Sequence, residues 1–265
     1  MKKRWGLILF GGLSICTVIV TVSATLQEQK TKGPRPATLQ KADEDFYTIV
    51  DYATPEPGAR AKQTSYKVRQ RRYNMPPQRG VDPKRFAITE DRQSTFGLPP
   101  SHSPVEPALP VGQADAIVVG DVVSATAFLT EDKTNVLSEF TLHVTDLIRE
   151  NLIAPFSVGD SLIAIRGGGG IRFESGKIIR YGSEGKPLPR VGTQYVFFLK
   201  YNDDEGKDYS IITAYALLPD GVVPLDGLAL DGTTIPAYAA YQRYKGSSTT
   251  QFRIQVSEAS VANPI

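Results

Sequence analysis

Beginning at Asp115, the chain alternates short segments rich in Val, Ile, Phe and Tyr with turns that contain Gly, Asp and Asn. In one of these segments Phe140, Leu142 and Val144 alternate with polar residues, which is typical of a strand with one buried face. The segment 195–201 (YVFFLKY) is almost continuously apolar and fits a central strand. We therefore predict an all-β domain over residues 114–228, a small OB-like or related β-barrel of seven to eight strands.

Two glycines make specific predictions about strand geometry. Gly120 lies in the middle of the segment 116–128 (AIVVGDVVSATAF), where it predicts a bulge or a tight bend in a long first strand. Gly176 follows Ser175 between segments 171–174 and 177–181, which together predict a hairpin with a two-residue loop. In that register Phe173 would face Ile178.

The strand pattern fades after the barrel. We expect residues 229–265 to form a C-terminal extension that is only partly ordered. Within it, 237–244 (AYAAYQRY) predicts two helical turns, and 252–256 (FRIQV) predicts a last edge strand or a tail.

Residues 27–113 are expected to form a basic, Pro-rich linker that is mostly disordered. They contain twelve prolines, each of which removes an amide donor and disfavours helix before it. Their apolar content is too low to offset the chain entropy lost on folding. The segment 45–52 (DFYTIVDY) is the main apolar island and a candidate for docking, and 86–88 is a weaker one. The most basic window, 67–79 (KVRQRRYNMPPQR), is interpreted as a solvated linker, with contact to anionic lipid or cell-wall polymer as the alternative.

The N-terminus predicts a signal peptide or a transmembrane anchor over residues 1–26. Lys2, Lys3 and Arg4 precede 22 residues without a charge, a length that can cross a hydrocarbon layer of about 30 Å as a helix. Small residues at 22–24 also fit a cleavage site after Ala24. Both readings place the rest of the chain outside the cytoplasm, with the membrane as a partner of residues 5–26 if they are not cleaved.

Composition excludes several kinds of site. The single Cys16 allows no internal disulfide and no thiolate metal cluster. His143 alternates with core residues and should face solvent, and His102 lies in the linker, so neither is expected to act in catalysis. Residues 115–265 hold 13 basic and 18 acidic residues, a balance that argues against nucleic-acid binding by this domain. We expect no catalytic residue, no metal and no cofactor.

The glycine run 167–170 and the arginines around it form the candidate binding site. A phosphate-binding P-loop needs a Lys and a helix after its glycines, whereas a strand-like segment follows here. The structural interpretation is a flexible loop between strands or a close backbone approach inside a barrel. The functional interpretation is an anion or ligand site that uses free amides and nearby guanidinium groups. Its candidate residues are Arg166, Gly168, Gly169, Arg172, Arg180 and Arg190.

The densest acidic run, 203–208 (DDEGKD), lies between two predicted strands. It lacks the spacing and the closing Glu of an EF-hand calcium loop. We interpret it as a solvated hairpin loop.

Several short stretches give the domain a resemblance to known proteins. The stretches 114–120 (ADAIVVG), 138–141 (SEFT), 166–170 (RGGGG), 188–192 (LPRVG), 195–199 (YVFFL), 213–215 (TAY) and 224–226 (PLD) resemble a group of uncharacterised exported bacterial proteins. That resemblance implies export and a β-rich domain, and no particular activity. The stretch 192–199 is also similar to a strand of the OB-like barrel shared by netrin modules and tissue inhibitors of metalloproteinases. The disulfides and the N-terminal Cys of that group are absent here, so the similarity does not extend to protease inhibition.

The first functional hypothesis is an exported or membrane-anchored envelope protein, held at the inner membrane or secreted to the periplasm or exterior. Its non-catalytic barrel would bind a protein or a glycan. One alternative is an extracytoplasmic hydrolase that uses carboxylates from loops. Another is a scaffold that is recognised through its Pro-rich tether.

Overall fold

The computed structural model describes residues 48–53, 64–74, 86–91, 107–183, 185–228 and 234–263. The predictions for residues 1–26 and for most of the linker lie outside this part of the chain. Among the described residues, no helix has the length and apolar content needed to span a bilayer.

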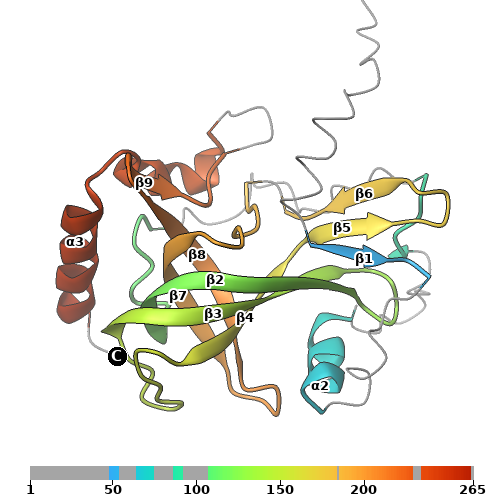
Figure 1. Ribbon diagram of the computed structural model, residues 1–265, viewed down its shortest axis with the longest axis horizontal. Coiled ribbons are helices and arrows are strands. Elements are labelled where there is room, and N and C mark those ends of the chain that lie inside the picture. Colours follow the sequence, from blue (N-terminus) through green and yellow to red (C-terminus); the bar gives the residue numbers. More distant parts are fainter. Residues whose placement is uncertain are drawn as a thin grey trace, which may run out of the picture. The chain divides into compact units, whose positions relative to one another are not determined.

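The described residues form strands, two α-helices and one 3-10 helix (Figure 1). In chain order the elements are β1 (Ile49–Asp51), α2 (Thr64–Tyr73), β2 (Ala116–Leu129), β3 (Val136–Arg149), β4 (Ser161–Gly167), β5 (Gly169–Arg172), β6 (Ile178–Tyr181), β7 (Gln194–Asn202), β8 (Asp208–Leu218), β9 (Gly221–Pro224), the 3-10 helix η4 (Pro236–Tyr244) and α3 (Thr249–Ala262).

Five of the strands close into a barrel. β2 pairs antiparallel with β3 and β7, β3 pairs with β4, and β7 pairs with β8. β8 then runs parallel to β4, with Ala164 opposite Tyr209 and Ile165 opposite Ser210, which closes the ring. The predicted β-barrel is therefore confirmed, but five strands rather than seven or eight form it. Residues 114–228 do contain eight strands, of which β5, β6 and β9 lie outside the ring.

The barrel interior is filled by the alternating residues that predicted the strands. Phe140, Leu142 and Val144 of β3 are fully buried, and His143 between them is half-buried. They pack with apolar residues from all the other barrel strands, among them Val118, Val122, Leu162, Ala164, Phe197, Leu199, Ile211 and Ala214.

The ladder is irregular at Gly120, but the extra residue is Thr145 of the partner strand β3, whereas the bulge or bend was predicted in β2. The ladder between β2 and β3 shifts register between Val119 and Gly120. A Cβ at Gly120 would lie 3.2 Å from the carbonyl oxygen of His143, closer than most side chains tolerate. β2 is 14 residues long and pairs with both β3 and β7.

The second hairpin differs from its predicted register by one residue. Arg172 rather than Phe173 faces Ile178, and the Phe173 amide donates to the Lys177 carbonyl at 2.9 Å. The loop therefore has three residues instead of two, because Gly176 adopts a φ of 85° that ends the turn in the left-handed region. β5 also pairs in parallel with β1, so part of the apolar island at 45–52 docks on this hairpin as a third strand.

The C-terminal region is helical where an edge strand or tail was expected. Ser248 caps α3 by accepting a hydrogen bond from the Gln251 amide. Phe252, Val256 and Ser260 lie one helical turn apart and are buried, whereas Ile254 is 52% exposed. The alternation in FRIQV is thus not a strand pattern. The expected helical turns at 237–244 are present as η4.

Arg149, at the end of β3, holds the end of α3 against the barrel. Its Nη2 donates to the Ser260 carbonyl at 2.8 Å, its Nε donates to the Ser260 hydroxyl at 2.9 Å, and its Nη1 donates to the Val111 carbonyl. A cation at a helix C-terminus is favourable because the last carbonyl groups carry partial negative charge. Burial lowers the pKa of Arg149 below its usual value.

Candidate ligand-binding pocket

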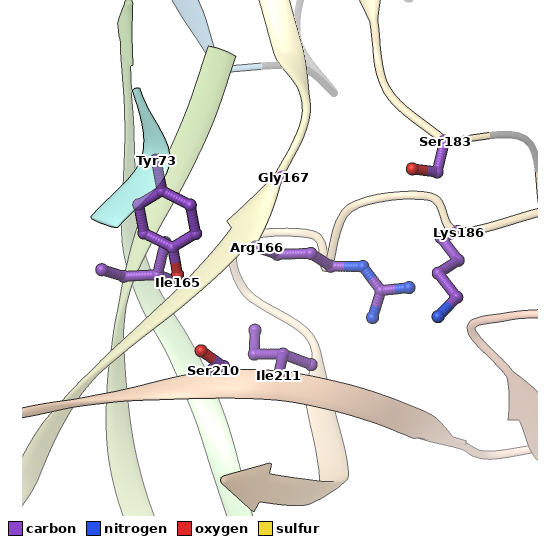
Figure 2. Close-up of a pocket in the computed structure, with 8 residues that line it drawn as sticks. All are labelled: Tyr73, Ile165, Arg166, Gly167, Ser183, Lys186, Ser210 and Ile211. Carbon is purple, nitrogen blue, oxygen red and sulfur yellow. The ribbon is translucent and has the colours of Figure 1, made fainter. Parts of the chain in front are cut away.

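The ladder that closes the barrel is short, and β4 and β8 separate beyond Ile165 and Ser210. The space that opens there is a pocket of about 230 Å³. Its walls come from α2, β4, β8 and the segment after β6 (Figure 2). The lining residues are Tyr73, Ile165, Arg166, Gly167, Ser183, Lys186, Ser210 and Ile211.

Arg166 is the central polar residue of this pocket. Its side chain is only 5% exposed, and its Nη2 donates to Oδ1 of Asp226. Its Nε and Nη1 are buried and have no hydrogen-bond partner among the described residues. Figure 2 shows the guanidinium extending from β4 toward Lys186. A buried charged donor without an acceptor costs about 1–3 kcal/mol or more, so Arg166 has strong unused donor capacity at the pocket wall.

Asp226 is the fixed counterion of Arg166. It follows β9 and its side chain is 0% exposed. Burial raises the pKa of Asp226 above its usual value, while Arg166 and a hydrogen bond from Thr213 act in the opposite direction. The Asp226 carbonyl accepts from Nε2 of Gln242 in η4 at 2.9 Å. The main chain of Asp226 is therefore held in place, whereas its Oδ2 is buried and has no hydrogen-bond partner among the described residues.

The remaining polar groups of the pocket add one cation and three hydroxyl groups. Lys186 lies with its Nζ 5.0 Å from the centroid of the Tyr238 ring. Together with Arg166 it outweighs the single charge of Asp226, which leaves the pocket with a net formal charge of about +1. The hydroxyl groups belong to Tyr73, Ser183 and Ser210, and the apolar surface belongs to Ile165 and Ile211.

Helix α2 is held on the barrel by an arginine clamp, which we define as Arg69 and Arg72 with the carboxylates of Glu139, Asp204 and Asp208. Arg69 donates from Nε to Asp208 at 2.5 Å and from Nη1 to Glu139. Arg72 donates from Nη1 to Asp208 at 2.8 Å and from Nε to Asp204 at 3.0 Å. The clamp places the last residue of α2 at the pocket.

Around the clamp, apolar contacts and a further hydrogen bond fix the helix. Tyr66 packs edge-on against Phe128 of β2, with ring centroids 5.8 Å apart. Nδ2 of Asn135 donates to the Tyr73 carbonyl at 2.8 Å. Because Tyr73 is both the end of α2 and a lining residue, a complete pocket depends on the docked helix.

The clamp changes the interpretation of two charged segments. The basic window at 67–79 was expected to be solvated, yet Arg69 is buried and Arg72 is largely covered. The acidic run at 203–208 is the β7–β8 turn, as predicted, but Asp208 is fully buried rather than solvated. Desolvation raises the pKa of Asp204, but hydrogen bonds from Arg72 and from the Gly206 amide outweigh it, and the pKa lies below its usual value.

The structure brings only one of the sequence-predicted site residues into the pocket, namely Arg166. Gly168 joins β4 to β5 and Gly169 begins β5, where a Cβ at Gly169 would lie 2.8 Å from Cγ1 of Val136. That is the close backbone approach given above as part of the structural interpretation. Arg172 is about half exposed and lies 3.5 Å from Asp51. Arg180 and Arg190 are exposed and do not line the pocket.

Sequence reasoning did not nominate Tyr73, Ser183, Lys186, Ser210 or Asp226 for this site. They come from separate segments that only the closed barrel and the docked helix bring together. The sequence signal that bore on this site was the prediction of strands in the two segments that contain Arg166 and Ser210.

Among the residues that the structure describes, no group of three or more His, Cys, Asp or Glu side chains could hold a metal ion. His143 lies within β3, opposite Asp121 of β2 and Ser161 of β4.

Comparisons of this chain with protein-family models, with curated proteins and with solved structures found no match. The function is therefore argued from the site itself.

Proposed function

We propose that this protein presents a non-catalytic, OB-like barrel that binds a protein or a glycan through an anionic group seated between β4 and β8. The observation that carries the proposal is the guanidinium of Arg166, with two buried nitrogens that lack a partner among the described residues, at the wall of a pocket. Arginine is well suited to carboxylate and phosphate groups because its N–H groups are planar, charged and fixed in direction.

The strand order supports an OB-like barrel. The first barrel strand, β2, pairs with β3 and with β7, and the third, β4, meets the last, β8, in parallel. Five strands in this order, closed by one short parallel ladder, are what we expect of an OB-like Greek-key barrel. Barrels of that kind bind oligonucleotides and oligosaccharides on one strand face and in adjoining loops. The acidic balance of residues 115–265 favours a ligand other than nucleic acid.

The state of the carboxylates favours binding over hydrolysis. A two-carboxylate hydrolase needs one carboxyl group free to donate a proton and a second free to attack or to activate water. Glu139, Asp204, Asp208 and Asp226 are all engaged by arginines in the structure. Such pairing favours the charged carboxylate and opposes the role of a proton donor, although at Asp226 burial outweighs the pairing and raises the pKa.

Export remains part of the proposal. It rests on the basic residues at 2–4 and on the uncharged segment 5–26 that follows them. A barrel outside the cytoplasm, anchored or secreted, would meet envelope proteins and glycans as ligands. A fusion of residues 1–53 to a periplasmic reporter enzyme should give activity in a bacterial host, and reporter activity confined to the cytoplasm would contradict export.

The binding proposal is tested on the full-chain protein by calorimetric titration with sodium acetate, sulfate and phosphate at constant ionic strength. We expect saturable binding of at least one of these anions. The affinity should fall at least tenfold in R166M and be unchanged in R172M, which removes the same charge from a half-exposed arginine. K186Q is a second test that leaves the pair of Arg166 and Asp226 intact, and it should weaken binding severalfold. Absence of saturable binding, or equal losses in R166M and R172M, would refute the proposal.

A further inference from the structure

Resting on the proposed function, we infer that the pocket takes one carboxylate group on a hydroxylated ring of monosaccharide size, the chemistry of a hexuronate. The ligand is either the free sugar acid or the terminal residue of an acidic glycan. Size, charge and hydrogen-bonding capacity of the pocket each favour this class over its competitors.

The volume limits the ligand to a small molecule or to a single residue of a polymer. The pocket measures about 230 Å³, below the roughly 300–1,000 Å³ that is usual for sites that bind drug-sized ligands. A nucleotide or several residues of peptide would not fit. Acetate would leave most of the volume unfilled, including the apolar surface of Ile165 and Ile211.

The charge balance favours a monoanion. Arg166 and Lys186 carry two positive charges beside the single carboxylate of Asp226, so one further negative charge neutralises the site. A phosphate monoester carries about −1.5 to −2 at pH 7 and would overcompensate. It would also place its second charge close to Asp226, where repulsion is strong because the surroundings are buried.

The hydrogen-bonding capacity of Ser210 favours a ligand that carries hydroxyl groups. Its Oγ donates to Oδ1 of Asn202 at 3.2 Å and accepts from Nδ2 of the same side chain at 3.0 Å. A hydroxyl group has one donor and two acceptor lone pairs, so Ser210 retains one lone pair for the ligand. That lone pair attracts a ligand O–H and repels a carboxylate or phosphate oxygen. The carboxylate is therefore assigned to the side of Arg166, and the sugar hydroxyls to the side of Ser210 (Figure 2).

The aromatic wall is consistent with a sugar ring. Tyr73 lines the pocket from α2, and the Arg72 guanidinium lies 5.6 Å from the centroid of its ring. Aromatic side chains offer an apolar face with a polar tip, which suits a ring that has both C–H and O–H groups.

The experiment is a calorimetric titration of the full-chain protein with four probes at matched ionic strength: sodium D-glucuronate, D-glucose, D-glucose 6-phosphate and sodium acetate. Glucuronate should bind at least tenfold more tightly than glucose, which lacks the charge, and than acetate, which lacks the ring. The affinity for glucuronate should also exceed the affinity for glucose 6-phosphate. A glucuronate-terminated disaccharide then separates the two sources, since affinity equal to or above that of the free sugar indicates a glycan end and weaker binding indicates the free acid.

Three variants assign the contacts. S210A should weaken the binding of glucuronate severalfold and leave the binding of acetate unchanged, because only the sugar reaches Ser210. S161A, at the exposed start of β4, is the matched control and should change neither affinity.

Glu184 is the one residue of 107–228 that the structure does not describe, so E184Q tests whether its carboxylate occupies the site. Glucuronate affinity in E184Q should stay within about threefold of the unaltered protein.

The outcomes separate the two proposals. If glucose 6-phosphate or acetate binds at the Arg166 site as tightly as glucuronate, the hexuronate assignment is wrong and the anion site stands. If glucuronate binds only after E184Q, the site is filled by the protein itself and the assignment is overturned. If no anion in either titration series binds, the proposed function fails and this inference fails with it.

Discussion

Replacing Arg69 with Met should strongly destabilise the protein, because Arg69 is the buried centre of the arginine clamp. Its guanidinium reaches the carboxylates of Glu139 and Asp208, and all three side chains are at most 9% exposed. Met has a similar length and helix propensity, so the substitution removes the charge and the hydrogen bonds with little change in α2 itself.

The magnitude follows from what the substitution leaves behind. Breaking a buried ion pair by removing one partner costs about 3–5 kcal/mol, because the other charge stays buried. Asp208 keeps hydrogen bonds from Arg72 and from Asn202, both at 2.8 Å, so its loss is partly compensated. The cost is also limited by the docking free energy of α2, since the helix can detach and let water reach the carboxylates. We therefore expect a loss of about 3 kcal/mol, which corresponds to a fall in Tm of about 6–12 °C.

Arg71 supplies a matched control on the same helix. Its side chain is 73% exposed, and its nitrogen lies 3.8 Å from Glu205, a surface pair worth about 0–1 kcal/mol. Urea denaturation of R69M and R71M, followed by circular dichroism, compares equal changes of charge at a buried and an exposed position. Hydrogen exchange of the α2 amides should rise in R69M alone. Free energies of unfolding that agree within about 0.5 kcal/mol would refute the reasoning, because they would show that the buried pairs do not hold the helix.

Two further predictions concern the clamp and the turn after β4. D204N should lower the free energy of unfolding at pH 7. The difference in free energy of unfolding between D204N and the unaltered protein should shrink as pH falls below about 4, because the pKa of Asp204 is lowered in the folded protein and acid therefore removes the contribution of its bonds to Arg72. A difference that grows in acid would contradict this. G169A should cost at least about 1 kcal/mol more than G176A in denaturant unfolding, because only Gly169 combines positive φ with a Cβ 2.8 Å from Val136, and equal costs would contradict the close approach.

The barrel strands were predictable because their signal is local. Alternation in β3 and the apolar run in β7 arise from which face each residue turns to the interior, and the structure places both strands as expected. Gly120 also marked the place of an irregularity in the ladder, although the extra residue there belongs to β3 and not to β2. The hairpin register was not predictable from composition, because it depends on the positive φ that Gly176 adopts.

The two helices were missed for different physical reasons. α2 has almost no apolar periodicity, since arginines and not a hydrophobic stripe attach it to the barrel. No sequence pattern could reveal that its cations would meet carboxylates more than 60 residues away. In α3 the alternation of Phe252, Ile254 and Val256 imitates a strand, and only the burial of residues four apart identifies the helix.

The candidate site was predictable only in part. Arg166 could be nominated because a charged residue ends an apolar strand beside a glycine run. The sequence could not distinguish Arg166 from Arg172, Arg180 and Arg190, since all four lie in or near the same segments. What singles it out is its place directly after the last β4–β8 pair, where Arg166 is buried, whereas the other three arginines lie at the surface.

The most direct test of the binding site is an NMR spectrum of the arginine Nε–Hε groups, recorded before and after addition of sodium D-glucuronate to the full-chain protein. Assignment by single Arg-to-Lys variants identifies each signal. The Arg166 signal should move on titration, because its Nε gains an acceptor, while the signals of Arg69 and Arg149 stay in place. An unmoved Arg166 signal with shifts at Arg172, Arg180 or Arg190 would contradict the site and place binding on the exposed arginines instead.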